Sequence, residues 1–262
     1  ATAFAQAGVG TLLLLGRDGQ KLETARHSLA QFRQTCVHCL VADLGITADI
    51  TAIAAQILHL LPQPDILVNN AGLGRFVPFM QMDEALFDAH FNLNIKAPYF
   101  LTQALLPALM ARQGNIINIS SYFAQRMLPD RATTAYSASK GALLLMSEAL
   151  RMEVKQFGIE VTTISPGDYA TDIASRRYHA PVNENSPYAE VYAKQLQLMN
   201  EHVDSGGDPK EMADKILKVI NIKHPKVHYK QGSFLQKFSI VLKRLLPSKS
   251  YEKMLMKHYS LN

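Results

Sequence analysis

The chain alternates short apolar runs with longer segments in which apolar residues recur every three or four positions. The apolar runs predict strands, and the periodic segments predict helices between them. The predicted strands cover residues 11–16, 37–42, 65–70, 114–121, 159–165 and 227–230. The predicted helices cover residues 18–34, 47–61, 83–112, 134–157 and 208–220.

Strands that alternate with helices at this spacing predict βαβ units, and therefore an α/β fold with a doubly wound parallel sheet. The run 11–16 contains four consecutive leucines, which predicts a strand buried on both faces. Binding sites in such sheets lie at the carboxyl ends of the strands. Residues that follow strands are therefore the first candidates for function.

Tyr136 and Lys140 lie four residues apart in the predicted helix 134–157. This spacing places the phenol and the ammonium on one face of the helix. A phenol has a pKa of about 10 in water, and a neighbouring cation lowers that pKa because it favours the phenolate. The pair is a candidate acid/base, although the same spacing also occurs on ordinary surface helices.

Further polar or small residues lie where strands end. Ser121 ends the strand 114–121, and the sequence Asn-Asn-Ala-Gly closes the strand 65–70. Pro-Gly, followed four residues later by Thr171, closes the strand 159–165. Asn94 lies inside the predicted helix 83–112, where an amide is unfavourable because it competes for backbone hydrogen bonds.

In this order and spacing, the motifs resemble those of the short-chain dehydrogenases/reductases (SDRs) of ordinary length, over about residues 1–230. The resemblance implies a Rossmann-like fold, a nicotinamide cofactor, and interconversion of a carbonyl and an alcohol. Tyr136 would exchange a proton with the substrate oxygen, and Ser121 would orient that oxygen. Lys140 would lower the pKa of Tyr136 and hold the nicotinamide ribose, and Asn94 would anchor a water in a proton relay.

The resemblance also assigns residues to the cofactor. Those implied to line it, besides Tyr136 and Lys140, are Asn70, Ala71 and Gly72, with Pro166, Gly167 and Thr171 at the carboxamide. Asp43 and Leu44, after the second strand, match the position that contacts the adenine.

The cofactor preference is inferred from the end of the strand 11–16. An acidic residue there would bind the ribose 2′-hydroxyl, but this chain has Gly16 followed by Arg17. A guanidinium suits a 2′-phosphate, so NADP(H) is predicted over NAD(H). The alternative is that Arg17 is a solvated loop cation.

The resemblance implies a strand and a glycine-rich turn before the segment at residues 1–9, which corresponds to the helix after that turn. Neither the strand nor the turn is found in this sequence, so the chain is predicted to be N-terminally truncated. The absent strand would lie between the strands 11–16 and 65–70. Without it, each unmet buried backbone group would cost several kcal/mol.

The net charge of +5 is unevenly distributed. Between Lys223 and Lys257 there are nine Lys/Arg residues and one acid, Glu252. The apolar residues of 234–245 follow helical spacing, and 251–258 predicts a second short helix. We therefore divide the chain into a Rossmann-like NADP-binding and catalytic domain, 1–232, and a basic amphipathic helical extension, 233–262. The extension could pack on the domain or a second subunit, cover the site, or contact a membrane surface.

Other classes of function are disfavoured. Cys36 and Cys39 lie three apart on a predicted strand, hence on opposite faces, and no second ligand pair is nearby, so neither a redox pair nor a metal site is expected. No apolar run approaches the roughly 18–20 residues of a spanning helix, and no signal or transit peptide is expected. No nucleic-acid module is recognised. A cytoplasmic location is expected, with a location peripheral to a membrane as the alternative.

Two functional hypotheses follow. The first is an NADP(H)-dependent carbonyl reductase or alcohol dehydrogenase acting on a small, hydrophobic or lipid-like molecule, because aromatic residues lie near the site. The second is a non-catalytic NADP-binding or scaffold protein of the same fold. The resemblance also implies a homodimer or a homotetramer.

Overall fold

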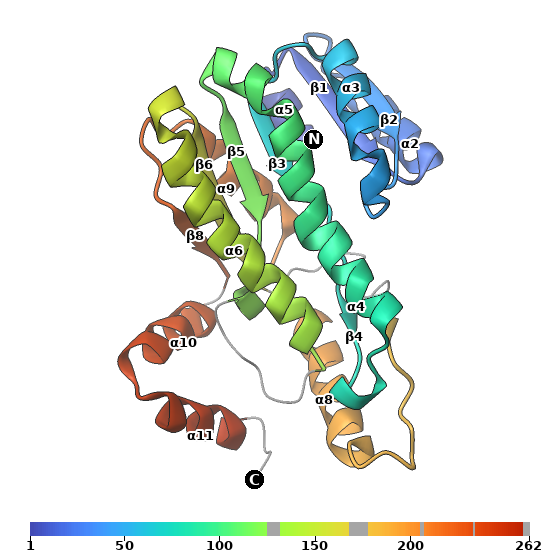
Figure 1. Ribbon diagram of the computed structural model, residues 1–262, viewed down its shortest axis with the longest axis vertical. Helices are drawn as coiled ribbons and strands as arrows, with labels where there is room; N and C mark the ends of the chain where they lie inside the picture. The colour runs from blue at the N-terminus through green and yellow to red at the C-terminus, as the bar shows by residue number, and fades with distance from the viewer. Residues whose placement is uncertain (125–131, 168–177, 205–206, 233, 259–262) are drawn as a thin grey trace.

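The computed structural model describes residues 1–124, 132–167, 178–204, 207–232 and 234–258 (Figure 1). The strands are β1 Thr11–Gly16, β2 Cys36–Val41, β3 Ile66–Asn69, β4 Arg75–Phe76, β5 Asn115–Ile119, β6 Glu160–Pro166, β7 Tyr178–His179 and β8 His228–Gln231. All six predicted strands are present, with bounds that differ by at most two residues. The two-residue strands β4 and β7 were not predicted.

The α-helices are α1 Thr2–Gln6, α2 Gly19–Leu29, α3 Ile50–Leu60, α4 Glu84–Phe91, α5 Ala97–Arg112, α6 Thr134–Val154, α8 Ala189–Asp204, α9 Pro209–Ile220, α10 Phe234–Leu245 and α11 Ser248–His258. Short turns are η1 Thr47–Asp49, η2 Phe79–Gln81, η3 Asn92–Lys96, η4 Tyr122–Ala124 and η5 Lys155–Phe157. Side-chain caps begin several helices: Asp83 accepts from the Leu86 N–H (2.7 Å) and Asp208 from the Lys210 N–H (2.8 Å).

The helix predicted over 83–112 is present from Glu84 to Arg112, but a π-helical turn, η3, within it separates α4 from α5. Pro98 has no backbone N–H, so it cannot donate to the carbonyl of Asn94 as an α-helix would require. The turn is therefore wider at Asn94, and such turns are common at functional sites.

Every described strand pair is parallel, which agrees with the predicted fold class. The central sheet has the order β3-β5-β6-β8, while β1 pairs with β2 and β4 pairs with β7 in separate small sheets. No hydrogen-bonded ladder joins β1 to β3 in the described part of the chain. The break falls where the family resemblance implies a further strand.

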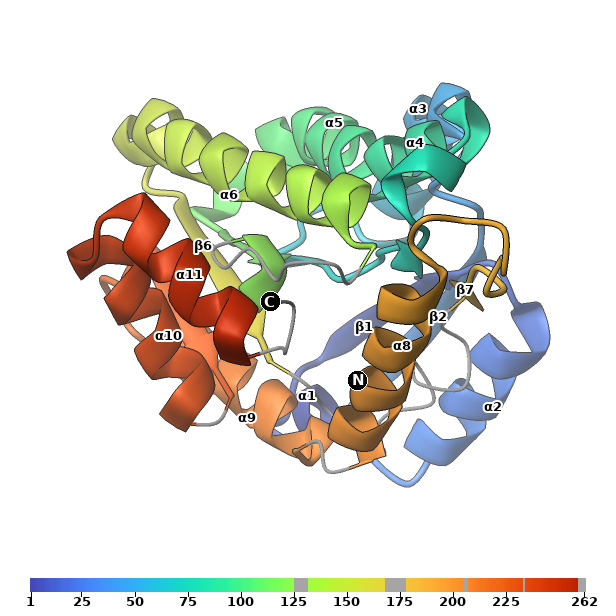
Figure 2. The same cartoon turned by 90° about the horizontal axis from the view of Figure 1, so that it is seen from below.

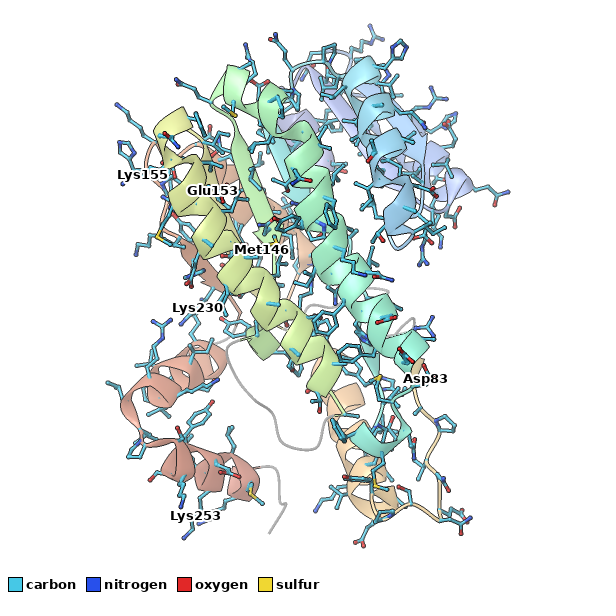
Figure 3. The ribbon with its side chains drawn as sticks, viewed as in Figure 1. Asp83, Met146, Glu153, Lys155, Lys230 and Lys253 are labelled. Atoms are coloured by element: carbon cyan, nitrogen blue, oxygen red, sulfur yellow. The ribbon has the colours of Figure 1, made fainter. Side chains whose placement is uncertain are left out.

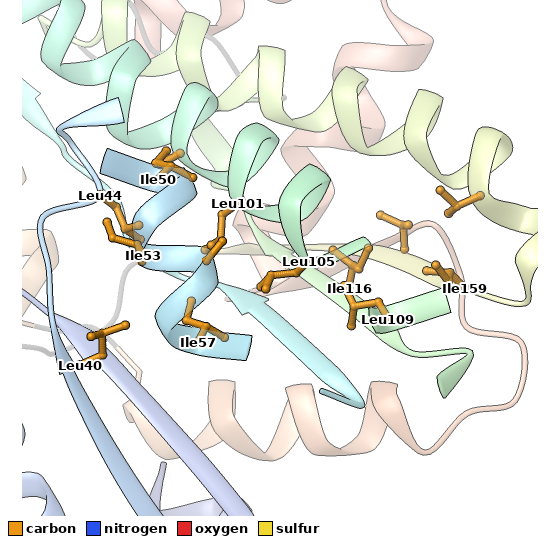
Figure 4. Close-up of a cluster of buried hydrophobic side chains, with 14 residues drawn as sticks. Leu40, Leu44, Ile50, Ile53, Ile57, Leu101, Leu105, Leu109, Ile116 and Ile159 are labelled. Atoms are coloured by element: carbon orange, nitrogen blue, oxygen red, sulfur yellow. The ribbon is translucent and has the colours of Figure 1, made fainter. Parts of the chain in front are cut away.

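Helices cover both faces of the sheets (Figure 2). Helices α3, α5 and α6 lie on one face, while α1, α2 and α9 lie on the other. Strand β5 links two cores, because Ile116 packs in the first and its neighbour Ile117 in the second. The first core includes residues of α3, α5, β5 and β6 (Figure 4). This alternation is expected for a strand buried on both faces.

The prediction that residues 11–16 form a fully buried strand was wrong. All six residues of β1 are only half-buried, and so are the four residues of β3. Among the described residues, β1 is hydrogen-bonded only to β2, and β3 only to β5, so one edge of each strand is unpaired there. The leucines of β1 are consequently more accessible than their hydrophobicity predicts.

Gly114 precedes β5, and its substitution tests the packing of this turn. A Cβ there would lie 2.8 Å from the carbonyl oxygen of Asp65, which accepts from the Asn115 N–H, and 3.0 Å from Leu109 Cδ2. We expect Gly114→Ala to lower the free energy of unfolding by about 1–3 kcal/mol in urea titrations. Gly10→Ala is the control, because a Cβ there meets nothing within 4 Å. Equal stability of the two variants would contradict the packing.

Candidate active site

The side chain of Lys140 is buried in α6, with only 4% of the residue exposed. Its Nζ donates to the carbonyl oxygen of Ile119, at the end of β5, over 2.9 Å. Burial lowers the pKa of Lys140 from 10.5 to about 8, because removal of the ammonium from water disfavours its charge. Most of this lysine is still cationic at neutral pH, and its charge faces the end of a central strand.

The amide of Asn94 connects three segments. Its Oδ1 accepts from the Leu73 N–H (2.8 Å), while its Nδ2 donates to the Leu73 carbonyl (2.9 Å) and to Ser139 Oγ (2.9 Å). A Cβ on Gly72 would lie 3.3 Å from Asn94 Oδ1 and 3.2 Å from Lys140 Nζ. The loop after β3, the π-helical turn and α6 therefore meet at one point, and the absence of a side chain at Gly72 keeps room there.

Ser121 is buried and begins the turn into η4. Its Oγ accepts from the Phe123 N–H over 3.2 Å, which orients the hydroxyl. The preceding residue, Ser120, donates through its Oγ to the Lys140 carbonyl (3.1 Å). The end of β5 is thus bound to α6 at two places, through Ile119 and Ser120, and this holds Ser121 next to the helix that bears Tyr136.

Tyr136 is half-buried among aromatic rings. The rings of Phe76 and Phe123 each pack edge-on against it, with centroids 5.8 Å away, and the imidazole of His90 lies at 6.4 Å. Gly74 faces the same ring, because a Cβ there would lie 3.5 Å from Cε2 of Tyr136. These contacts fix the plane of the phenol, and they surround it with apolar surface.

The sequence reasoning missed His90 and Phe76. His90 is fully buried, and burial lowers its pKa. Its Nε2 accepts from the Arg75 N–H (3.1 Å), so the neutral ring donates from Nδ1 to the Leu86 carbonyl (2.8 Å). His90 therefore holds β4 against α4. Its only sequence signal was its position, four residues before Asn94 on the same helical face.

Strand β4 also connects the site to the following segment. Phe76 stacks on the ring of His179, with centroids 5.4 Å apart. The hydroxyl of Tyr192, on α8, reaches the carbonyls of Phe76 (3.2 Å) and Ala180 (2.9 Å). One wall of the aromatic cluster is thus fixed by β7 and α8, which the sequence did not predict.

Two groups of the predicted cofactor residues lie at the carboxyl ends of strands β3 and β6 of the central sheet. Asn70, Ala71 and Gly72 follow β3 and are exposed. Pro166 ends β6, and the Gly167 N–H donates to the Gln231 carbonyl of β8 over 2.7 Å. Thr171 lies outside the described residues. The exposed backbone after β3 is an accessible surface beside Lys140.

Arg17 and Asp43, at the ends of β1 and β2, form an ion pair of 3.6 Å. Both side chains are accessible to water, so the pair contributes at most about 1 kcal/mol. Asp43 Oδ1 also accepts from the Gly45 N–H (2.8 Å), which orders this loop. Leu44 packs in the first hydrophobic core, so any contact that it makes with a bound molecule would come from its backbone.

Cys36 and Cys39 are free thiols. Cys36 lies beside His38 (Sγ to Nε2, 3.5 Å), whereas the Cys39 thiol donates to the Leu22 carbonyl (3.5 Å) of α2. Burial raises the pKa of Cys39, which disfavours a reactive thiolate. Among the described residues, no group of three or more His, Cys, Asp or Glu side chains could hold a metal ion.

The burial of Lys140 predicts a pH-dependent stability. Between its folded pKa of about 8 and its ordinary value of 10.5, the unfolded chain binds a proton that the folded chain lacks. The free energy of unfolding should therefore rise with pH in this window, relative to that of Lys140→Met, by up to about 3 kcal/mol. Urea unfolding of both proteins at pH 7 and pH 10 measures this difference, and parallel pH dependences would exclude it.

Comparison with known proteins identifies the family. Residues 1–181 match the family model for short chain dehydrogenases. A dehydrogenase/reductase SDR family member 7B from Bos taurus is 34% identical over 229 residues, 85% of this chain. The chain spans 66% of the length of that relative. A 3-ketodihydrosphingosine reductase from Bacteroides thetaiotaomicron is 30% identical over 213 residues, 80% of this chain and 78% of that protein.

A solved structure shares the fold. It is that of a metagenomic short-chain oxidoreductase in complex with NADP, with a TM-score of 0.67 and 26% sequence identity, and it covers 89% of this chain and 91% of that one. The parallel sheet, the helices on both faces and the family match over residues 1–181 agree with one another. The chain therefore belongs to the short-chain dehydrogenase/reductase family of oxidoreductases.

Proposed function

We propose that this chain is an NADP(H)-dependent oxidoreductase that interconverts a carbonyl and an alcohol, with Tyr136 as the acid/base. The proposal rests above all on the buried ammonium of Lys140, one helical turn from Tyr136. Burial of a cation costs free energy, and buried groups with strongly shifted pKa values cluster at functional sites. Stabilisation of a nearby phenolate is the function that we assign to this cation.

The chemistry of the proposed residues follows from their surroundings. In reduction, the Tyr136 hydroxyl gives its proton to the carbonyl oxygen of the substrate, and the Lys140 charge stabilises the phenolate that forms. Ser121 donates a hydrogen bond to the same substrate oxygen and holds it toward Tyr136. In oxidation, the Tyr136 phenolate accepts the hydroxyl proton of the alcohol substrate. Asn94 keeps the loop after β3 beside Lys140, and its predicted water relay remains part of the proposal.

The residues at the sheet edge fit a nicotinamide nucleotide. Gly72 leaves a space that a Cβ would fill, between Asn94 Oδ1 and Lys140 Nζ, and the exposed backbone of 70–72 borders it. Lys140 would hold the ribose there, and Pro166, Gly167 and Thr171 would hold the carboxamide. When bound, the nicotinamide supplies or accepts the hydride.

Arg17 supports NADP(H) over NAD(H). Its ion pair with Asp43 is long and solvated, so the guanidinium can turn to a 2′-phosphate at little cost. Gly16, where an acidic residue would favour the 2′-hydroxyl, leaves that position without negative charge. The metagenomic short-chain oxidoreductase in the structural comparison was solved in complex with NADP, which supports the same preference.

The aromatic rings around Tyr136 support an apolar substrate. Phe76 and Phe123 present little polar surface to the reacting group. The similar protein from Bacteroides thetaiotaomicron is named as a 3-ketodihydrosphingosine reductase, which also favours a lipid-like ketone. We further propose a homodimer or homotetramer, and a cytoplasmic location.

The alternative is a non-catalytic NADP-binding or scaffold protein. A protein that only binds a nucleotide needs neither a tyrosine beside a buried lysine nor a serine at the end of β5. The conjunction of Ser121, Tyr136 and Lys140 around one strand end therefore favours the enzyme.

Replacing Tyr136 by Phe tests the acid/base role. The variant keeps the ring contacts with Phe76 and Phe123 but has no proton to give, so kcat should fall by about 10²–10⁴-fold. NADPH oxidation with a panel of apolar ketones and aldehydes measures this loss. Tyr99→Phe, at an exposed position on α5, is the matched control and should keep full activity. Equal rates for wild type and Tyr136→Phe would refute the proposed mechanism.

Replacing Arg17 by Ala tests the cofactor preference. Loss of a charge-assisted hydrogen bond to the 2′-phosphate should raise the Kd for NADPH by roughly 10–100-fold, while the Kd for NADH changes by less than about threefold. Titration of the cofactor fluorescence measures both constants. Arg26→Ala removes an exposed arginine of α2 that pairs with Glu23, and it serves as the control. An equal loss for both cofactors would show that Arg17 does not read the phosphate.

A further inference from the structure

Helix α10 has a partly exposed apolar stripe. Phe238, Val241 and Leu245 are 45%, 44% and 74% exposed, and their spacing of three and four residues places them on one helical face. Ile240, on the opposite side of the helix, is buried. The amphipathic pattern therefore has one apolar side turned to the protein and a second apolar stripe turned to solvent.

Helix α10 and the two elements before it in the chain carry several basic residues. They are Lys215 and Lys218 of α9, Lys226 before β8, Lys230 of β8, and Lys237 and Arg244 of α10. The pKa of Lys215 is lowered by burial and then by the charges of its neighbours Lys218, Lys237 and Lys226. The pKa of Lys230 is lowered by burial and then by Arg244. The cations of three elements thus lie close enough to repel one another.

Acidic residues compensate this charge only in part. Helix α9 carries Glu211 and Asp214, and the Glu211 carboxylate accepts from the Gln231 side chain at 3.5 Å. From Lys223 to Lys257 the chain holds nine basic residues and one acidic residue. An anionic partner would relieve the repulsion among the cations.

We propose that the Phe238–Val241–Leu245 stripe and its basic neighbours dock on the surface of an anionic lipid bilayer. A bilayer surface satisfies both features at once, because its headgroups neutralise the cations while its acyl boundary takes up the apolar side chains. Among the described residues, no helix combines the length and the apolarity that a membrane-spanning helix requires.

Two other kinds of partner would match only one of the two features, either the cations or the apolar stripe. A dissolved polyanion would bind the cations but leave Phe238 and Leu245 in water. A second copy of the chain, related by a twofold axis, would cover the stripe but bring a second set of cations against the first. The combined apolar and basic character therefore favours the bilayer.

Helix α11, in the same C-terminal extension, packs against the aromatic cluster of the candidate active site. Tyr251 and Leu255 of α11 are buried against Leu242 of α10 and against Phe123, whose ring also contacts Tyr136. If the proposed function holds, docking brings the aromatic wall of the site close to the bilayer. The substrate class that suits this arrangement is an amphiphilic ketone or aldehyde that partitions into the membrane.

Sedimentation with vesicles tests the docking on the full chain, without cofactor or turnover. Vesicles of phosphatidylcholine with added phosphatidylglycerol should bind at least about tenfold more tightly than phosphatidylcholine alone, and added salt should weaken binding. The double variant Lys237→Glu/Arg244→Glu should lose about tenfold or more in affinity. Phe238→Ser/Leu245→Ser should lose a similar factor, because the apolar contact is removed.

Matched controls separate docking from general effects. Met152→Ser alters an apolar side chain on α6 that is also 74% exposed. Lys155→Glu reverses a charge at the end of α6, far from the C-terminal extension. Figure 3 shows this separation, with Lys230 close to the extension and Lys253 on α11. Both controls should bind vesicles like wild type. Circular dichroism melting of each variant shows that the fold is retained.

Equal binding to both kinds of vesicle, or wild-type binding by both tail variants, would overturn the proposal. So would size-exclusion data in which Phe238→Ser/Leu245→Ser dissociates an oligomer, since a second copy would then cover the stripe. Vesicle binding by an inactive protein would reject the proposed enzymatic function and leave the docking intact. An active enzyme that does not bind vesicles would reject the docking and leave the proposed enzymatic function intact.

Discussion

The amide of Asn94 is the interaction on which the candidate site depends. Its three hydrogen bonds join the backbone of Leu73 to Ser139, and hence the loop after β3 to the helix that bears Tyr136 and Lys140. The amide can reach both because the helix widens into a π-turn at this residue. This connection adds to the hydrogen bonds that join the end of β5 to α6 through Ile119 and Ser120.

The buried charge of Lys140 makes this corner unfavourable for folding and suitable for chemistry. Desolvation lowers the lysine pKa to about 8, and Nζ has the Ile119 carbonyl as a partner. A polar carbonyl solvates the ammonium without neutralising it, so the positive field persists near the tyrosine. A carboxylate in the same place would raise the lysine pKa but cancel that field.

The C-terminal helices join two surfaces with different physical character. Tyr251 and Leu255 face Phe123 and the body of the protein, whereas Phe238 and Leu245 face solvent among cations. Both surfaces arise from the same amphipathic segment, because two short helices joined near Pro247 expose more than one apolar face. The helical extension thus has one apolar face toward the protein and another toward solvent.

The sequence by itself determined the features that depend on residues close together in the chain. It was sufficient for the six longer strands and for the spacing of Tyr136 and Lys140, because each depends on neighbours within a few residues. Only the tertiary structure decided the π-turn at Asn94, the hold of His90 on β4 and the half-exposure of β1. Those features depend on partners distant in the chain and on which strands pair, and no local pattern encodes them.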